Sequence, residues 1–552
     1  LWARLLKNNF APITVGAFDY IVGNPPWVNW EHLPDRYREN TKDLWSHYQL
    51  AGQFKGGRPR LGTVKVDLSA LMTYVVMDKL LKRDGKLGFV ITQSLLKTAA
   101  GAGFRRFKLP DHTPLKVVLV DDMVALNPFE GASNRTAVII LQKGRDTRYP
   151  IPYTLWRKVK GEKFTYDSTL DEVKAATRRL NLYAEPVDPH DPTSQWLTAR
   201  PKAIHALRKV LGQSAYKAHE GVNTGGANGV YWVEQVMTRP DGLIVVRNLT
   251  EGAKRKVDEV TEPVEPHLLY PLLRGRDVQR WRAEPSAWII VPQNPHEPST
   301  AYPEVQLQKD YPRTYGYLKR FEKILRERSG YKQILSKREE EFYGLMDIDH
   351  YTFTEWKVVW REQSSLMTAA VVGAYEGKLV IPDHKLMLID CASEEEAHYL
   401  CALLNSSIVA LKVLAYAVSI QMDPHILERL RIPRFDPQNP VHRRLAELSA
   451  RAHQIVSQWD GKSARSEDAE TVPIPKEIDL EAILPRLKPE DAAKLLEVVN
   501  AYQRAQTELQ TIEQAIDEAA AQVWGLTDAE LREIQQSLKE LSASPDEEET
   551  SA

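Results

Sequence analysis

The chain has 552 residues, with 73 lysines and arginines against 74 acidic residues and a formal net charge of −1. This length requires several domains, and the neutral total excludes a uniformly basic coat while leaving room for basic grooves balanced by acidic segments elsewhere. The two cysteines (Cys391 and Cys401) and the lack of an apolar run of about 18 residues exclude a disulfide framework and a membrane span, and indicate a cytoplasmic protein.

The first informative segment is a hydrophobic strand over 18–23 that leads directly into Asn24, Pro25, Pro26 and Trp27. Two consecutive prolines cannot continue a hydrogen-bonded ladder, so the strand is predicted to stop and turn there. The turn would lie at the carboxyl end of the strand, where open α/β sheets bind their ligands.

These residue types suit chemistry on an exocyclic amine of a nucleobase, which is a poor nucleophile because its lone pair is delocalised into the ring. The Asn24 carboxamide oxygen and the Pro25 carbonyl could accept the two N–H bonds and restore amine character. Trp27 could stack on an extruded base, a contact worth about 1–3 kcal/mol. The alternative interpretation is that the prolines only end a strand and that Trp27 is a core aromatic residue.

Residues 1–150 alternate apolar strands with a helical stretch, which predicts a doubly wound α/β sheet. The segment 129–134 links the last two strands and predicts a hairpin at the sheet edge, and Asp84 and Gly85 predict a turn after the helix. The predicted elements are a helix over 67–82 and strands over 86–92, 115–121 and 135–142.

This order of elements resembles motif IV and the following part of adenine-N6-specific DNA methyltransferases of the fused Type II (Type IIG-like) restriction–modification family. The resemblance implies the second half of a Rossmann-like methyltransferase sheet, with Asn24, Pro25, Pro26 and Trp27 as the catalytic motif. It implies site-specific methyl transfer from S-adenosylmethionine to adenine N6 in double-stranded DNA by base flipping. At the fourth motif position the family more often has tyrosine or phenylalanine; Trp27 is a tolerable departure because stacking needs only an aromatic face.

The cofactor half of this fold is largely missing from the sequence. The family holds its cofactor mainly by a glycine-rich turn after the first strand, and the 23 residues before Asn24 contain no such turn. The chain also begins with Leu1 rather than methionine, so we expect the cofactor motif, and any nuclease, in a missing N-terminal segment or a partner chain. Asp19 and Asp67 are expected to border the remaining cofactor pocket; the alternative for Asp67 is a helix N-terminal carboxylate.

Beyond residue 150 we expect an irregular connection over 151–215 and then a mixed α/β region over 216–435. The latter resembles the target-recognition domain of fused restriction–modification methylases. The segment 436–552 is predicted to be helical, with heptad-like spacing from Glu477 onward and an acidic tail. These helices could form a spacer, an oligomerisation arm or a clamp around DNA, but packed antiparallel helices are the simpler expectation.

Two basic segments are candidate DNA contacts. Lys55, Arg58 and Arg60 lie in a loop between the motif and the first helix, where a basic lid could close on the DNA backbone; a surface loop is the alternative. Charged residues over 319–328 are explained equally well by a solvated helix face.

The densest basic–aromatic cluster contains Arg274, Gly275, Arg276 and Arg280 beside Trp281. Arginines on a loop can bind phosphates or read guanine edges. The structural alternative is an Arg–Asp salt-bridged turn with Trp281 in the core.

Other chemistries lack a supporting pattern. The glycine-rich loop 223–229 lacks the lysine and spacing of a phosphate-binding loop and is interpreted as a turn or a DNA-approach segment. No histidine spacing predicts a metal site, and no nuclease motif is evident. Two other functions stay open: a methylase of protein glutamine or RNA, and a DNA-recognition scaffold that is inactive without its missing part.

Overall fold

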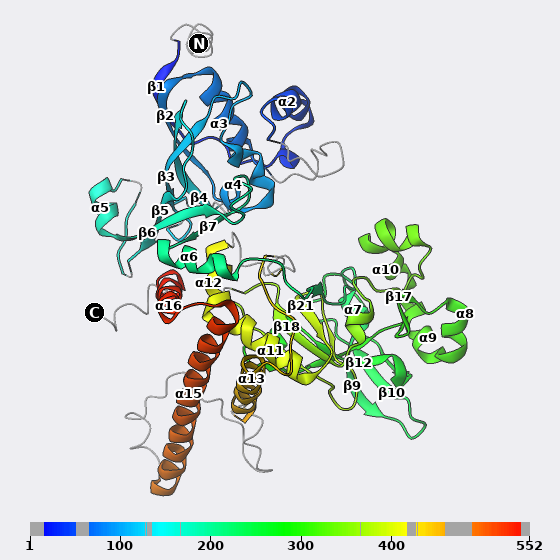
Figure 1. Cartoon of the computed structure of the whole chain (residues 1–552). Helices are drawn as coiled ribbons and strands as arrows, with labels where there is room; N and C mark the ends of the chain where they lie inside the picture. Colours follow the sequence, from blue (N-terminus) through cyan, green and yellow to red (C-terminus); the bar gives the residue numbers. More distant parts are fainter. Residues whose placement is uncertain are drawn as a thin grey trace. The chain divides into compact units, whose positions relative to one another are not determined.

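The computed structural model describes most of the chain and divides it into two compact units (Figure 1). The first unit contains Leu1–Arg208, Leu411–Ser419 and Arg532–Ala552, and the second contains Lys209–Ala410 and Ile420–Leu531. The described residues are 16–50, 66–126, 128–129, 135–159, 161–165, 167–364, 366–416, 427, 429–458 and 488–542.

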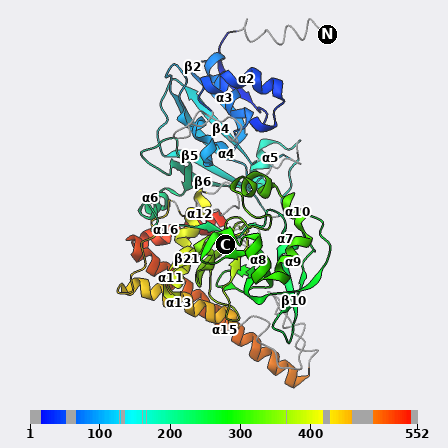
Figure 2. The same cartoon turned by 90° about the vertical axis from the view of Figure 1, so that its right-hand side faces the viewer.

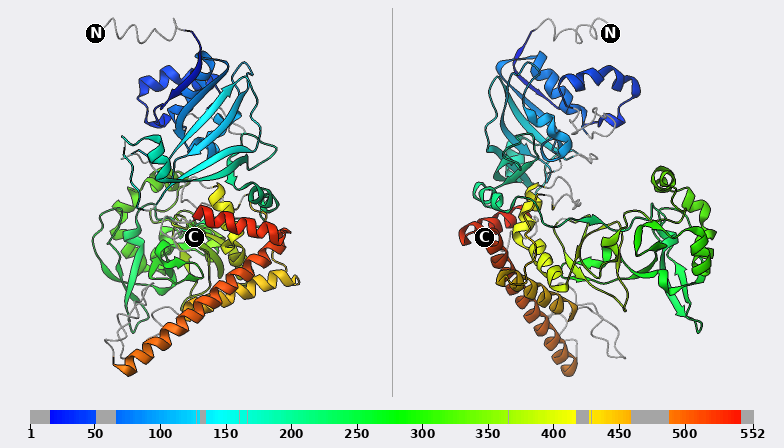
Figure 3. Two further views of the ribbon diagram at one scale, coloured as in Figure 1. Left: turned by 90° about the vertical axis from the view of Figure 1, so that its left-hand side faces the viewer. Right: turned by 45° about the vertical axis from the view of Figure 1, so that its right-hand side comes forward.

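A seven-stranded mixed sheet forms the centre of the first unit, with the strand order β1-β2-β4-β3-β5-β6-β7 (Figure 3, left). Strands β1 and β2 are parallel, as are β3 and β5, and the other neighbours are antiparallel. The bounds are β1 Phe18–Gly23, β2 Leu81–Thr92, β3 Leu115–Asp122, β4 Thr136–Lys143, β5 Ile151–Lys158, β6 Thr177–Pro186 and β7 Trp196–Ala199.

The early strands follow from their apolar runs. Alternate residues of β2 (Leu87, Phe89 and Ile91) are buried in the same core as Ile139 and Leu141 of β4. Helix α3 (Leu68–Lys79) packs on β2 and contributes to that core. The prediction of an α/β fold is therefore confirmed, together with its helix and its three strands.

The predicted turn at Asp84 and Gly85 is instead part of β2. The β1–β2 register shifts between Phe18 and Tyr20, and Asp84 has a left-handed backbone with φ 64°. Asp84 and Gly85 therefore lie at a local irregularity of strand pairing within β2, rather than in a connection between the helix and the strand.

The expectation of an irregular connection over 151–215 is wrong for its first part, because β5, β6 and β7 extend the sheet there. Strand β6 buries Leu180, Leu182 and Ala184 while its intervening residues are largely polar. This half-polar pattern obscured the strand in the sequence. Since β4 lies between β2 and β3, the β3–β4 hairpin is internal rather than at the sheet edge.

Short helices complete the first unit, and segments distant in sequence return to it. Lys97, at the end of α4, donates to the Ala415 carbonyl, and Arg157 donates to the Glu540 carbonyl at 2.6 Å. Helices α6, α12 and α16 each continue into the second unit. The helix bounds are α2 Asp35–His47, α4 Ser94–Lys97, α5 Leu170–Ala175, α6 Pro201–Val210, α12 Ser407–Tyr416 and α16 Asp528–Ser542.

The second unit contains a six-stranded sheet, β11-β10-β9-β15-β12-β20, a four-stranded sheet, β19-β18-β21-β8, and two short hairpins. The first sheet has β9 Trp232–Thr238, β10 Ile244–Asn248, β11 Thr261–Val264, β12 Leu269–Leu273, β15 Ala287–Ile290 and β20 Ile381–Pro382. The second has β8 His219–Glu220, β18 Trp356–Arg361, β19 Ala370–Val372 and β21 Leu386–Cys391. The hairpins are β13 Val278–Gln279 with β14 Arg282–Ala283, and β16 Gln293–Asn294 with β17 Glu297–Ala301.

Helices surround these sheets, and α13 packs along the long helix α15 (Figure 2), joined by an ion pair between Arg451 and Glu508. The helices are α7 Asn228–Tyr231, α8 Glu304–Asp310, α9 Pro312–Arg320, α10 Glu322–Arg326, α11 Glu394–Asn405, α13 Pro440–Gln458 and α15 Pro489–Trp524. The predicted mixed α/β region and C-terminal helices are thus confirmed.

Within the described ranges, no single helix is long and apolar enough to cross a membrane. Helices α11 and α12 reach that length and composition only as a pair, and they are bent by 54° relative to each other.

Candidate active site

The segment Asn24–Trp27 lies at the carboxyl end of β1, directly after Gly23, the last residue of the strand. Asn24 is exposed, and its carboxamide makes no hydrogen bond to any other described residue. Pro25 is buried and Pro26 exposed, so the double proline anchors the turn on one side and leaves the Asn24 amide on the surface. We call residues 24–27 the target-base turn.

Trp27 is half-buried, and two contacts orient its indole. The ring nitrogen Nε1 donates to the Val90 carbonyl of β2 at 3.1 Å. The ring also meets Phe129 edge-to-face, with the centroids 4.9 Å apart. The aromatic residue of the turn is therefore fixed against the parallel neighbour of β1. No residue pattern points to Val90, because a backbone carbonyl can come from any residue.

Asp67 is the N-cap of α3, and its carboxylate accepts the Ser69 backbone N–H at 2.9 Å. The same carboxylate accepts hydrogen bonds from the hydroxyls of Ser69 and Thr92. Asp67 is only 2% exposed. Burial raises the pKa of Asp67, while the hydrogen bonds from Ser69 and Thr92 act in the opposite direction. The helix N-terminal carboxylate, considered as the alternative for this residue, is the observed geometry.

The described residues do not form a complete S-adenosylmethionine pocket. Asp19 is an exposed residue on β1, and its carboxylate is paired with the Lys82 amine at 2.9 Å. Among the described strands only β2 pairs with β1, and Tyr20 and Val22 of β1 are 74% and 85% exposed. The donor set in this part of the chain therefore does not fit the methionine and ribose parts of the cofactor.

The structure shows the Arg274–Trp281 cluster as a tightly bonded turn in the second unit. Arg274 is 9% exposed; its backbone N–H donates to Asp277 at 2.8 Å, and its guanidinium bonds to Asp277 and Ser286. Gly275 begins the 3₁₀ turn that follows. Arg276 differs, because its side chain is 72% exposed and is 3.9 Å from Asp277.

Arg280 and Trp281, the second half of the cluster, are also bonded within the second unit, and the Arg280 side chain is 39% exposed. Arg280 donates to the Asn405 carbonyl and pairs with Glu513 at 3.1 Å. Trp281 is 2% exposed, donates through Nε1 to Glu513 at 3.0 Å and packs edge-to-face on His453. Arg274, Arg280 and Trp281 are thus engaged within the protein, in the arrangement given as the structural alternative.

A polar cleft of about 770 Å³ also lies in the second unit, and the glycine-rich loop 223–229 forms one wall. Three of the lining residues each have one buried side-chain atom with no hydrogen-bond partner among the described residues: Thr224 Oγ1, Asn228 Oδ1 and His384 Nδ1. Desolvation lowers the pKa of His384. The charged lining residues are two cations, Lys254 and Arg338, and three acidic residues, Glu340, Asp347 and Asp349.

The buried Arg328 side chain is hydrogen-bonded to this wall of the cleft. Its fully buried guanidinium donates to the carbonyls of Thr224, Phe342 and Gly344. The sequence left a DNA contact and a solvated helix face as equal alternatives for Arg328, and the buried side chain fits neither. This structural role of Arg328 could not be predicted from residue types, because its partners are backbone carbonyls.

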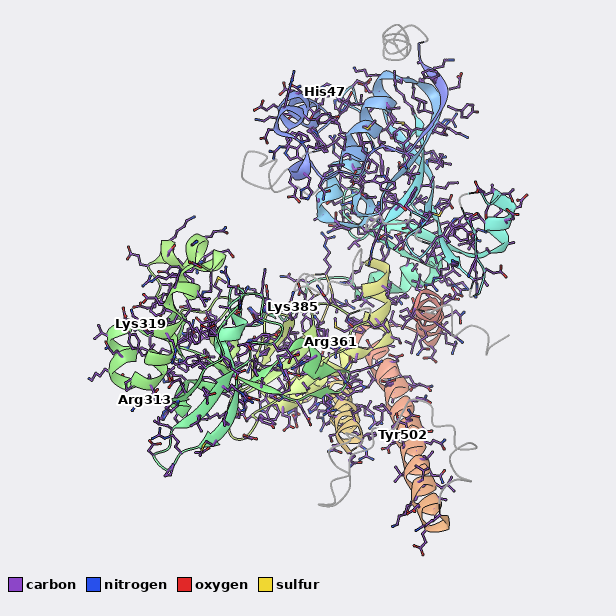
Figure 4. All side chains as sticks on the ribbon, turned by 180° about the vertical axis from the view of Figure 1, so that it is seen from behind. His47, Arg313, Lys319, Arg361, Lys385 and Tyr502 are labelled. Carbon is purple, nitrogen blue, oxygen red and sulfur yellow. The ribbon has the colours of Figure 1, made fainter. Side chains whose placement is uncertain are left out.

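The other cations of that segment are paired on the surface. Lys319 pairs with Glu304 and Glu322, at 3.2 and 3.0 Å, and projects with Arg313 from α9 (Figure 4). Arg320 pairs with Glu262 at 2.8 Å. Lys55, Arg58 and Arg60 lie outside the described residues. Nowhere in the described ranges do three or more histidine, cysteine or acidic side chains form a group able to hold a metal ion.

One protein-family model is similar to the first part of this chain. Residues 2–122, which include the target-base turn, α3 and β2, match the family described as Eco57I restriction-modification methylase. No curated protein matches the chain. The matched range contains the Asn24–Trp27 motif and most of the strands that the sequence predicts for residues 1–150.

Solved structures define the fold more broadly. The Type IIL restriction-modification enzyme MmeI, solved in complex with DNA, superposes with a TM-score of 0.50 and 13% identity, over 97% of this chain and 58% of that chain. A DrdV–DNA complex matches with a TM-score of 0.36 and 13% identity over 94% of this chain and 56% of that chain. The type IIG restriction endonuclease BpuSI matches with a TM-score of 0.27 and 13% identity, over 92% of this chain and 55% of that chain. The chain thus spans under three fifths of the length of each, and the MmeI likeness shows a shared fold.

Proposed function

We propose that this chain contains the target-base and DNA-recognition parts of a site-specific adenine-N6 DNA methyltransferase of a restriction–modification or phage-defence system. The observation that carries the proposal is the target-base turn, where the exposed Asn24 amide follows β1 and Trp27 is fixed beside it. The match of residues 2–122 to a restriction-modification methylase family supports it.

The turn supplies groups for the acceptor side of the reaction. An adenine extruded from the duplex would stack on Trp27, and its N6 hydrogens would be accepted by Asn24 Oδ1 and the Pro25 carbonyl. The two hydrogen bonds from N6 strengthen as the amine loses its conjugation with the ring and gains positive charge. They therefore favour the transition state over the ground state. S-adenosylmethionine would supply the methyl group.

We infer that the donor side comes from residues other than the described ones, in a further segment or a partner chain. Among the described strands only β2 pairs with β1, and Tyr20 and Val22 of β1 are exposed. A strand added beside β1 would satisfy the unpaired backbone groups of this edge. If that strand ran parallel to β1, its carboxyl end, where the family resemblance implies a glycine-rich turn, would lie at the same end of the sheet as Asn24. In this view the chain supplies the acceptor half of the active site.

DNA recognition is assigned to the second unit. The side chain of Arg276 is 72% exposed, and the polar cleft is lined by the exposed cation Lys254 and by polar residues such as Asn223 and Ser299. Such groups suit contacts to phosphates and base edges, which require donors and acceptors together. Lys55, Arg58 and Arg60 stay proposed as a basic lid near the target-base turn.

The test is transfer of a labelled methyl group from S-adenosylmethionine to three substrates: duplex DNA, RNA and a glutamine-containing peptide. The chain is assayed alone and with the coding region upstream of Leu1 added. We expect label in duplex DNA, recovered after digestion as N6-methyladenine. Label in RNA or peptide only, or in another nucleoside, would contradict the proposal. Duplex binding without transfer in either form would favour the DNA-recognition scaffold.

A further inference from the structure

Asp67 lies where three parts of the first unit meet: the exit of the target-base turn, the end of β2 and the start of α3. We propose that Asp67 is a positioning residue that holds the target-base turn against β2 by a hydrogen bond to Thr92. This inference rests on the proposed function, because it assigns a role relative to a turn whose chemistry was proposed above.

The backbone around Asp67 is joined to the chain just after the turn. Leu68 N–H donates to the Val28 carbonyl at 2.9 Å, and Trp30 N–H donates to the Val66 carbonyl at 3.2 Å. Asn29 and Asp67 form an antiparallel bridge between these two bonds. The segment that leaves the turn is therefore paired with the residues that begin α3.

The side chain of Asp67 joins the same residues to β2. One carboxylate oxygen accepts from Ser69, and the other accepts from the hydroxyl of Thr92, the last residue of β2. Two residues before Thr92, the Val90 carbonyl accepts the Trp27 indole N–H. The end of β2 thus contacts the turn through Val90 and is held to α3 through Asp67.

Capping alone does not require an aspartate at this buried position. Serine and asparagine cap helices about as well, and a buried carboxylate loses its solvation. Among the described residues no cation forms an ion pair with Asp67, and its 2% exposure leaves the carboxylate to its internal donors. A second oxygen that reaches Thr92 is what aspartate adds over serine.

Three variants separate these roles. Asp67→Ser keeps a cap but is too short to reach Thr92, and Thr92→Val removes the hydroxyl at nearly constant volume. Asp67→Asn keeps the length, caps the helix and can donate to Thr92 Oγ1. It is the conservative variant expected to rescue.

The first readout is backbone hydrogen exchange, followed by mass spectrometry in the 552-residue chain. Exchange of peptides covering 26–32 and 66–70 should rise about tenfold in Asp67→Ser and Thr92→Val, the effect of losing one buried hydrogen bond. Exchange should stay near wild type in Asp67→Asn, and β4 peptides (136–143) should be unchanged in all three. Unchanged exchange near the turn, or an equal rise in β4, would overturn the inference. If Asp67→Ser does not fold, Thr92→Val decides by the same criterion.

The second readout is methyl transfer to duplex DNA. In Asp67→Ser and Thr92→Val we expect kcat to fall about tenfold with KM for DNA unchanged, since the turn would be displaced rather than removed. Absence of transfer by the wild type, both alone and with the coding region upstream of Leu1 added, would count against the proposed function, whereas the exchange result would still decide whether Asp67 holds the turn. Full kcat in both variants would overturn the inference.

Discussion

The target-base turn and the Arg274–Trp281 cluster both combine polar groups with a tryptophan, yet the structure uses them in opposite ways. In the turn, the Asn24 amide is exposed and makes no hydrogen bond to a described residue. In the cluster, Arg274 and Trp281 are bonded to Asp277 and Glu513 inside the second unit. Residue types alone do not distinguish a site from a scaffold, because the nearby carboxylates decide which donors stay available.

Trp281→Ala should have the largest effect on stability. It removes a buried indole and its hydrogen bond to Glu513, so the free energy of unfolding should fall by about 3–5 kcal/mol. Chemical denaturation of the chain measures the change. A loss below about 1 kcal/mol would mean that the cluster is not a structural turn.

Trp27→Ala should instead affect function more than stability, because its indole is half-buried. Loss of stacking, worth about 1–3 kcal/mol, should lower methyl transfer to plasmid DNA about 10- to 100-fold. Trp27→Phe, which keeps an aromatic face, is the matched control and should retain most of the activity. Equal loss in both variants would show that the indole hydrogen bond to Val90, rather than stacking, is what matters.

Asp383 is a buried acidic residue whose charge interacts with Arg274 and Asp277 of the cluster, and it should make stability depend on pH. Burial, reinforced by Asp277, raises the pKa of Asp383 to about 6. Because the folded-state pKa is above the usual value, this group destabilises the fold increasingly as pH rises from about 4 through 6. Asp383→Asn should therefore stabilise the chain by about 1–3 kcal/mol at pH 8, and the gain should vanish towards pH 4. Denaturation curves at both pH values measure it, and a gain independent of pH would contradict the assignment.

Arg276→Ala should have the smallest effect, confined to DNA binding. The side chain is 72% exposed, so stability should change by less than about 0.5 kcal/mol. If Arg276 contacts a phosphate, the slope of log affinity against log salt should decrease by about one. Arg320→Ala, which removes an exposed arginine paired with Glu262, is the control and should leave the slope unchanged. Equal slopes for wild type and Arg276→Ala would remove Arg276 from the DNA interface.

The sequence predicted the parts of the fold that have strong periodic patterns. The strand before Asn24, the helix after Asp67 and the three following strands all lie close to their predicted ranges, because apolar runs bounded by turn residues specify them locally. Strand β6 was missed because its exposed positions are charged or polar, as in Arg178 and Asn181.

Contacts made by backbone carbonyls were not predictable from residue types. Trp27 donates to the Val90 carbonyl, and Arg328 donates to three carbonyls far from it in sequence. Such partners depend on tertiary placement, which no local pattern specifies. For Arg274 the sequence left two interpretations open, because an arginine three residues before an aspartate suits both a DNA-binding loop and a salt-bridged turn.

The central claim is that Asn24 acts on the target base, and its most direct test is the variant Asn24→Ala. Methyl transfer and duplex affinity are measured in one preparation, in whichever form of the chain transfers methyl groups. Asn24 is exposed and makes no hydrogen bond to a described residue, so its loss should leave folding and DNA affinity close to wild type. Transfer should fall at least about 100-fold, as when a transition-state hydrogen-bonding group is removed elsewhere. Transfer at the wild-type rate would contradict the assignment of the target-base turn.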